Sequence, residues 1–111
     1  MVEEVIISYL TGKLTVPVSG EVPTPRPTTF VTVERTGGSC TNKIRTDRLA
    51  IQSWAASEAE AAALNELVIG AMEESVSCNE ISKSKLNSNY NFTDTTTKHH
   101  RYQAVFDVVH F

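Results

Sequence analysis

Residues Leu86–Phe111 read LNSNYNFTDTTTKHHRYQAVFDVVHF and are the most informative segment of the sequence. It joins a polar run, Asn87–His100, to a strongly alternating segment. Successive side chains of a strand point to opposite faces, so residues of equal parity share a face. One face then carries Tyr102, Ala104, Phe106, Val108 and His110, and the other carries Gln103, Val105, Asp107, Val109 and Phe111. Because both sets are largely apolar, we expect a strand at the centre of a sheet, with no tail left for targeting or tethering.

The chain has the size and composition of one small globular domain. Its 111 residues suffice for one sheet and two helices around a modest core, so we expect a single domain over residues 1–111. A hydrophobic fraction of 41% with 21% charged residues argues against disorder. The formal net charge is −3 and the basic residues are scattered, which argues against sequence-independent binding to duplex DNA.

The N-terminal segment MVEEVIISYL has a short apolar run and no basic leading residues, so it does not match a secretion signal. No apolar run approaches the ~20 residues that a membrane span needs. We therefore expect synthesis in a cytoplasm and no membrane partner. Cys40 and Cys78 are then expected to be free thiols.

Helical spacing predicts two helices. The first covers Glu3–Leu10 and ends before Gly12. The second runs from about Ser57 to Val76 and opens with a capping box, in which the Ser57 hydroxyl accepts from an amide and Glu60 returns a bond. Its buried stripe is predicted to comprise Ala61, Leu64, Val68, Ala71 and Met72, with Leu67 at the margin.

Alternation and β-branched content predict the strands. Pro17 has no backbone N–H to donate to a neighbouring strand, so we expect the first strand at an edge of the sheet. The order α-β-β-β-α-β-β is typical of an α+β fold with a mostly antiparallel sheet of four to five strands and both helices on one face. The predicted strands are Leu14–Ser19, Phe30–Arg35, Arg48–Trp54, Glu80–Leu86 and Arg101–Phe111.

The residue types that carry catalysis or bind metals form no recognisable motif. His99 and His100 are adjacent, so a regular strand points them to opposite faces and they cannot share one metal ion. Neither cysteine has a C-x₂-C partner, and Gly37-Gly38 stands between strands rather than before a helix, unlike a phosphate loop. We therefore expect no catalytic residue, no metal and no cofactor.

Two polar segments, Gly37–Asp47 and Asn87–His100, are long for connections, where about four to six residues are usual. Both are rich in Thr, Ser and Asn, which suits either an interaction element or a solvated loop; we interpret them as interaction elements. Trp54 is either an interface anchor or a core residue packed against the second helix. The candidate residues for a subunit or tube interface are Lys43, Arg45, Arg48, Asp94, Thr95, Thr96, Thr97 and Lys98.

The segment YNFTDTTTKHHRYQAVFDVVHF resembles the ending of small tail proteins from prophages of Gram-positive bacteria, with its pattern D-x-x-T-x-x-x-R-Y-x-A-x-x-D-x-x-H-aromatic. The resemblance extends to VPVSGEVP, FVTVERTGG, LAIQSWAASEAEAAALNELV and the opening helix, and so spans nearly the whole chain. In these segments the chain is similar to the tail terminator, or tail completion, proteins of siphoviruses, whose tails are long and non-contractile.

This resemblance implies a structural virion protein without enzymatic activity. Members of that family form a homohexameric ring on the last ring of the tail tube, at the head-proximal end of the tail. There they stop tube polymerisation and join the tail to the head. The implied partners are further copies of the chain, the tail tube protein and a head-completion or neck protein.

DNA is expected to pass through the lumen of such a ring without specific binding, because six copies at −3 each carry about −18. Two alternatives stay open. One is a neck protein, either a head-closure or an adaptor component. The other is a host-encoded, non-enzymatic binding module.

Overall fold

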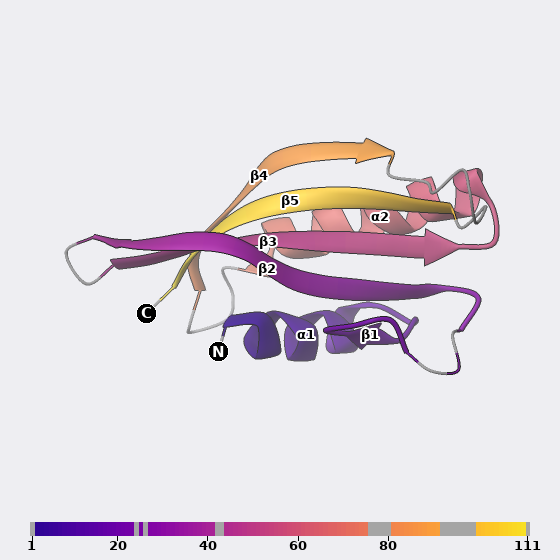
Figure 1. The fold of residues 1–111 in the computed structure, drawn as a ribbon, viewed down its shortest axis with the longest axis horizontal. Helices are drawn as coiled ribbons and strands as arrows, with labels where there is room; N and C mark the ends of the chain where they lie inside the picture. Colours follow the sequence, from indigo (N-terminus) through magenta and orange to yellow (C-terminus); the bar gives the residue numbers. More distant parts are fainter. Residues whose placement is uncertain are drawn as a thin grey trace.

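The computed structural model describes residues 2–23, 25, 27–41, 44–75, 81–91 and 100–110. Within them, two helices and a five-stranded sheet form an α+β domain, which confirms the predicted fold class (Figure 1). The elements are α1 (Val2–Lys13), β1 (Val18–Ser19), β2 (Phe30–Thr41), β3 (Ile44–Ala55), α2 (Glu58–Glu73), β4 (Ile81–Asn91) and β5 (His100–His110).

The sheet has the strand order β1-β2-β3-β5-β4. The C-terminal strand β5 therefore lies between β3 and β4, as its two apolar faces predict. β1 is at an edge, as Pro17 predicts, and the Pro17 carbonyl accepts a hydrogen bond from the Val31 amide at 2.9 Å. β1 comprises only the last two residues of the predicted strand Leu14–Ser19 and runs parallel to β2, whereas the other pairings of the described strands are antiparallel.

Both helices cover one face of the sheet, and their apolar side chains share one core with β2, β3, β4 and β5. Ile6 and Leu10 of α1 are fully buried in this core. The two helices also contact each other, because the Tyr9 hydroxyl donates to the Ala71 carbonyl at 2.7 Å. The sheet contributes Val31, Val33, Leu49, Ile51, Ile81, Ala104, Phe106 and Val108.

The helix α2 follows the predicted phase. Its buried residues include Ala61, Leu64, Val68 and Met72. Ala71, also predicted to be buried, is only partly buried, and Leu67, predicted at the margin of the stripe, is 63% exposed. The Glu60 amide donates to the Ser57 hydroxyl at 3.2 Å, so the predicted N-cap is confirmed. The helix bounds differ modestly from prediction: α2 ends at Glu73, and α1 continues through Gly12 to Lys13.

Trp54 lies on the sheet face opposite the helices, in a small cluster of its own. Its ring stacks on Phe30 with 5.2 Å between ring centroids, and the Arg101 guanidinium lies 4.7 Å from the Trp54 centroid. The residue is almost fully buried. Of the two roles considered for Trp54, packing within the chain is therefore the one observed, although its partners are Phe30 and Arg101 rather than α2.

The largest departure from prediction concerns the polar segment Gly37–Asp47. It is not a loop: β2 continues to Thr41 and β3 begins at Ile44, so the two strands form one long hairpin. The reason is tertiary, because β3 pairs with β5 over its length, from Arg45–His110 to Ala55–His100. A continuous backbone ladder of this kind overrides the local preference of polar side chains.

The prediction that the second polar segment, Asn87–His100, is a loop is wrong for part of its length. Its first five residues belong to β4, which runs to Asn91, and His100 opens β5. β4 accommodates its irregular sequence with register shifts between Ile81 and Lys83 and between Leu86 and Ser88. Residues 92–99 lie outside the described residues.

Candidate functional site

The β2–β3 hairpin is the most prominent surface feature of the domain. The molecule measures 44 × 25 × 24 Å, and Figure 1 shows the hairpin tip extending beyond both helices along the long axis. The last strand pair before the turn is Thr41–Ile44. Ile44 and Arg45 are exposed at this tip, and Ile44 keeps 56% of its surface accessible. The hairpin therefore presents an apolar and a basic side chain to solvent.

A buried ionic cluster ties the hairpin to β5 on the helix-bearing face. Arg35 of β2 donates from Nε to Asp47 Oδ1 of β3 at 2.7 Å, and Nε2 of His110 on β5 bonds the other oxygen, Oδ2. The side chains of Asp47 and His110 are only 7% and 9% exposed, whereas that of Arg35 is 44% exposed. Three neighbouring strands thus contribute one charged or titratable group each.

Gly38 makes room for this cluster. It is paired with Asp47 across the hairpin and follows a register shift between Arg35 and Gly37. A Cβ atom at Gly38 would collide with Asp47 Oδ1 and would lie 2.7 Å from Arg35 Nη2 and 2.9 Å from the Thr46 carbonyl oxygen. A larger residue at this position would therefore displace both backbone and the ion pair.

The cluster stabilises the ionised form of the Asp47 carboxylate. Burial raises the pKa of Asp47, but the hydrogen bonds and charges of Arg35 and His110 lower it by more, so the net pKa lies below its ordinary value. The pKa of Arg35 is raised, chiefly because its guanidinium donates to Asp47. Since both Asp47 oxygens have protein partners, the role of the cluster is structural: it joins β2, β3 and β5.

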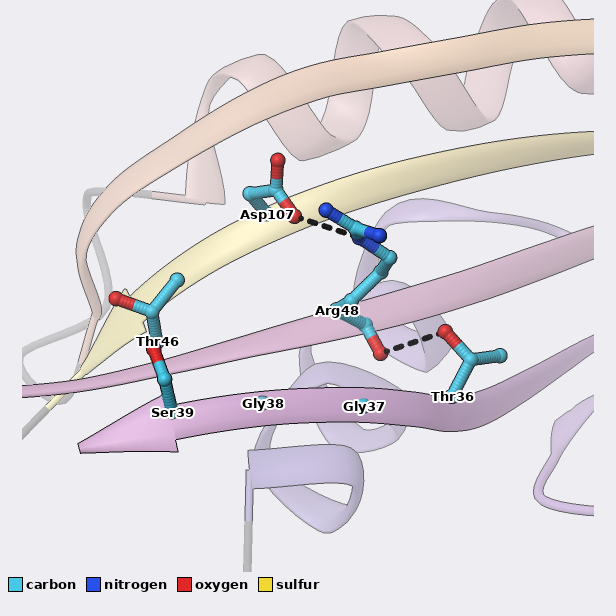
Figure 2. Close-up of a pocket in the computed structure, with 7 residues that line it drawn as sticks. All are labelled: Thr36, Gly37, Gly38, Ser39, Thr46, Arg48 and Asp107. Carbon is cyan, nitrogen blue, oxygen red and sulfur yellow. Dashed lines mark hydrogen bonds and ion pairs between the residues drawn. The ribbon is translucent and has the colours of Figure 1, made fainter.

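On the opposite face, the same hairpin borders a shallow polar pocket of about 350 Å³ (Figure 2). Figure 2 shows Arg48 and Asp107 turned toward each other from adjacent strands, with Arg48 Nε donating to Asp107 Oδ1 at 3.1 Å. Asn87 of β4 donates to Asp107 Oδ2 at 2.9 Å. The pocket is lined by Thr36, Gly37, Gly38, Ser39, Thr46, Arg48 and Asp107.

The pKa of Asp107 is also lowered. The main cause is the hydrogen bond from Asn87; burial opposes it, and the hydrogen bond and charge of Arg48 add to the lowering. Arg48 and Asp107 thus form a partly exposed ion pair whose charges largely compensate each other. The pocket is lined by polar groups, and within this pair each charge is matched by the opposite one.

Of the predicted interface residues, the structure describes Arg45 and Arg48. Arg45 and Arg48 are three residues apart on β3, so their side chains point to opposite faces of the sheet and do not form one basic patch. Arg48 is engaged by Asp107, whereas Arg45 is exposed near the tip. The remaining predicted residues, Lys43, Asp94, Thr95, Thr96, Thr97 and Lys98, lie outside the described residues.

Sequence reasoning missed the cluster of Arg35, Asp47 and His110. Its signal was present in the alternation, because each of the three stands two residues from a core position of the same strand. Arg35 follows Val33, Asp47 precedes Leu49, and His110 follows Val108. Polar groups that continue an inward-facing row are expected to find partners, since an unpaired buried charge is costly.

Neither described helix is long and apolar enough to cross a membrane. In the described part of the chain, no group of three or more His, Cys, Asp or Glu side chains is arranged to hold a metal ion. No protein-family model matches the chain, and no curated protein matches it.

Proposed function

We propose that this chain is a structural, non-enzymatic phage virion protein, a tail terminator whose copies form a ring at the head-proximal end of the tail tube. In this role the ring stops tube polymerisation and joins the tail to the head through a neck protein. The resemblance of the sequence segments suggests the role. The single structural observation that supports it best is the projecting β2–β3 hairpin.

A closed ring requires a heterologous contact, in which one patch of each copy binds a different patch of the next copy. An arm that leaves the body of the domain is well suited to supply one half of such a contact. The β2–β3 hairpin reaches beyond both helices and exposes Ile44 and Arg45 at its tip (Figure 1).

The hairpin is also pre-organised for docking. It is held at its base by Asp47, which binds Arg35 of β2 and His110 of β5 at the same time. A rigid arm loses less conformational entropy on association than a flexible loop does. The cluster therefore serves the proposed ring by fixing the direction in which the arm projects.

In this proposal the chain works through interface geometry rather than through bond chemistry. Asp47 on the hairpin and Asp107 on the adjacent strand β5 each have both carboxylate oxygens engaged by neighbouring side chains. The net charge of −3 per copy suits a lumen through which DNA passes without sticking.

Deletion of the gene from the phage or prophage that encodes it tests the role. We expect lysates in which heads are separated from abnormally long tails under the electron microscope, and normal particles when the wild-type gene is supplied on a plasmid. Tails of normal length that lack heads would instead identify a neck protein. Normal infectious particles from the deletion strain would exclude a role in virion assembly and favour the host-encoded binding module.

A further inference from the structure

The helix-bearing face holds an apolar groove of about 710 Å³ between α2 and the segment that joins α1 to β1. Leu14 and Val16 line it from the connector, and Ala63 and Leu67 line it from α2. Gly70 lies on the same wall, and open space surrounds the position of a Cβ atom there. Near the C-terminal end of α2, the groove therefore has room for an additional side chain.

Carboxylates border this apolar surface. Glu60, Glu66 and Glu74 of the α2 side line the groove, against the single ammonium group of Lys13. The lining thus carries a formal charge of −2 around an apolar centre. An occupant that combines an apolar side chain with positive charge would match it.

The tip of the β2–β3 hairpin has these properties. Leu67 in the groove and Ile44 at the tip are the two most exposed large hydrophobic side chains of the described residues, at 63% and 56%. Ile44 is followed by the exposed Arg45, and the sequence places Lys43 immediately before it. Contact between tip and groove would remove both apolar side chains from water and bring the guanidinium of Arg45 beside the carboxylates.

The tip cannot reach the groove of its own chain. The groove lies at the C-terminal end of α1, whereas the tip extends beyond the N-terminal end of that helix (Figure 1). The hairpin is held in the sheet by its pairing with β5 and cannot fold back. The matching surfaces must therefore meet between different copies.

We infer that the hairpin tip of one copy, centred on Ile44 and Arg45, docks into the Leu67–Gly70 groove of a second copy. The contact is heterologous, so each copy uses its tip on one neighbour and its groove on the other, and a rotation that closes on itself turns this repetition into a ring. This inference rests on the proposed ring and names the two surfaces that build it.

Site-directed crosslinking tests the contact. Cys40, which is exposed near the tip, supplies one thiol, and Leu67→Cys supplies the other in a Cys78→Ser background. A short bismaleimide is expected to give a ladder of covalent oligomers on a denaturing gel. Leu86→Cys is the matched control, because Leu86 is also an exposed leucine but belongs to β4. It is expected to give no ladder.

Filling the groove provides an independent readout. Gly70→Leu inserts a side chain into the open space, and we expect subunit association to weaken roughly 10- to 100-fold. Its melting temperature is expected to stay equal or rise, because leucine favours a helix interior more than glycine does. Gly12→Leu, on α1 and outside the groove lining, also meets open space and is expected to leave association unchanged.

The outcomes separate this inference from the ring itself. A ladder from Leu67→Cys together with weakened association of Gly70→Leu supports the docking. Rings that form normally with Gly70→Leu and give no ladder from Leu67→Cys overturn the docking and leave the ring standing. A wild-type chain that stays monomeric at every concentration overturns both.

Discussion

Gly38 and Asp47 face each other across the β2–β3 hairpin, and the space that Gly38 leaves empty is the space that the Asp47–Arg35 ion pair occupies. This relationship connects the local backbone to the ionic cluster. It also explains why two adjacent glycines of the hairpin are not equivalent: a Cβ atom at Gly37 meets nothing within 4 Å.

Gly38→Ala is expected to lower the free energy of unfolding by roughly 1–3 kcal/mol, because the added methyl group meets both a backbone carbonyl and the buried carboxylate. Gly37→Ala is the matched control and should change it by no more than about 0.5 kcal/mol. Urea denaturation of the two variants measures the difference. Equal stability of both would show that Gly38 is not the tight position.

The pH dependence of stability is expected to report the lowered pKa values of Asp47 and Asp107. An unfolded aspartate titrates near pH ~3.9, above both folded-state values. Between these values the unfolded chain binds more protons than the folded chain, so stability rises with pH in that window. The contribution is therefore present at neutral pH and is lost as the pH falls below about 4 through the folded-state pKa values.

Asp47→Asn isolates the part that comes from the buried cluster. The loss of unfolding free energy relative to wild type should be largest near neutral pH, where the wild-type carboxylate is ionised. It should shrink in acid, as the wild-type carboxyl becomes protonated. Denaturation at several pH values measures this trend, and a difference that is constant with pH would argue against an ionic role for Asp47.

Val68→Asp tests the packing of α2 on the sheet. Val68 is fully buried, so the variant places an unpaired carboxylate in the core at a cost of several kcal/mol and should abolish soluble protein. Leu67→Asp changes the neighbouring, exposed residue and should stay soluble with a native circular dichroism spectrum. A folded Val68→Asp variant with an unchanged melting temperature would contradict the observed helix phase.

Charge reversal at Arg45 and at Lys43, two positions earlier in the sequence, in Lys43→Glu/Arg45→Glu, is expected to leave the monomer folded, because an exposed charge such as that of Arg45 contributes only about 0–1 kcal/mol to stability. Ring formation should be impaired, since the reversed charges repel the carboxylates of the neighbouring groove. Analytical ultracentrifugation measures the assembly. Lys83→Glu/Lys85→Glu on β4 gives the same change in net charge and serves as the control. Equal impairment by both pairs would point to overall charge rather than to the tip.

The elements with strong periodicity could be predicted from the sequence. The Leu64, Val68 and Met72 stripe of α2 and the two-faced strand β5 are dominated by apolar residues at regular spacing, and both lie where the pattern predicts. The Ser57 cap also follows from local chemistry alone. In these places local preference and tertiary packing favour the same structure.

The hairpin and its cluster could not be predicted in the same way. The Thr, Ser and Gly content of Gly37–Asp47 favours a loop locally, and only the pairing of β3 with β5 makes it a strand. Asp47 and His110 are 63 positions apart, so their contact depends on a strand register that composition does not encode. Arg48 lies in β3, in agreement with the predicted strand Arg48–Trp54, yet its pairing with Asp107 depends on the same register.

Negative-stain electron microscopy of the purified chain, with native mass spectrometry of the same sample, shows whether copies of the chain assemble into a ring. We expect closed rings, of six copies as the resemblance implies, with a mass of about 73 kDa from a chain of 12.2 kDa. A single species of 12.2 kDa at every concentration, with no ring in the images, would contradict it.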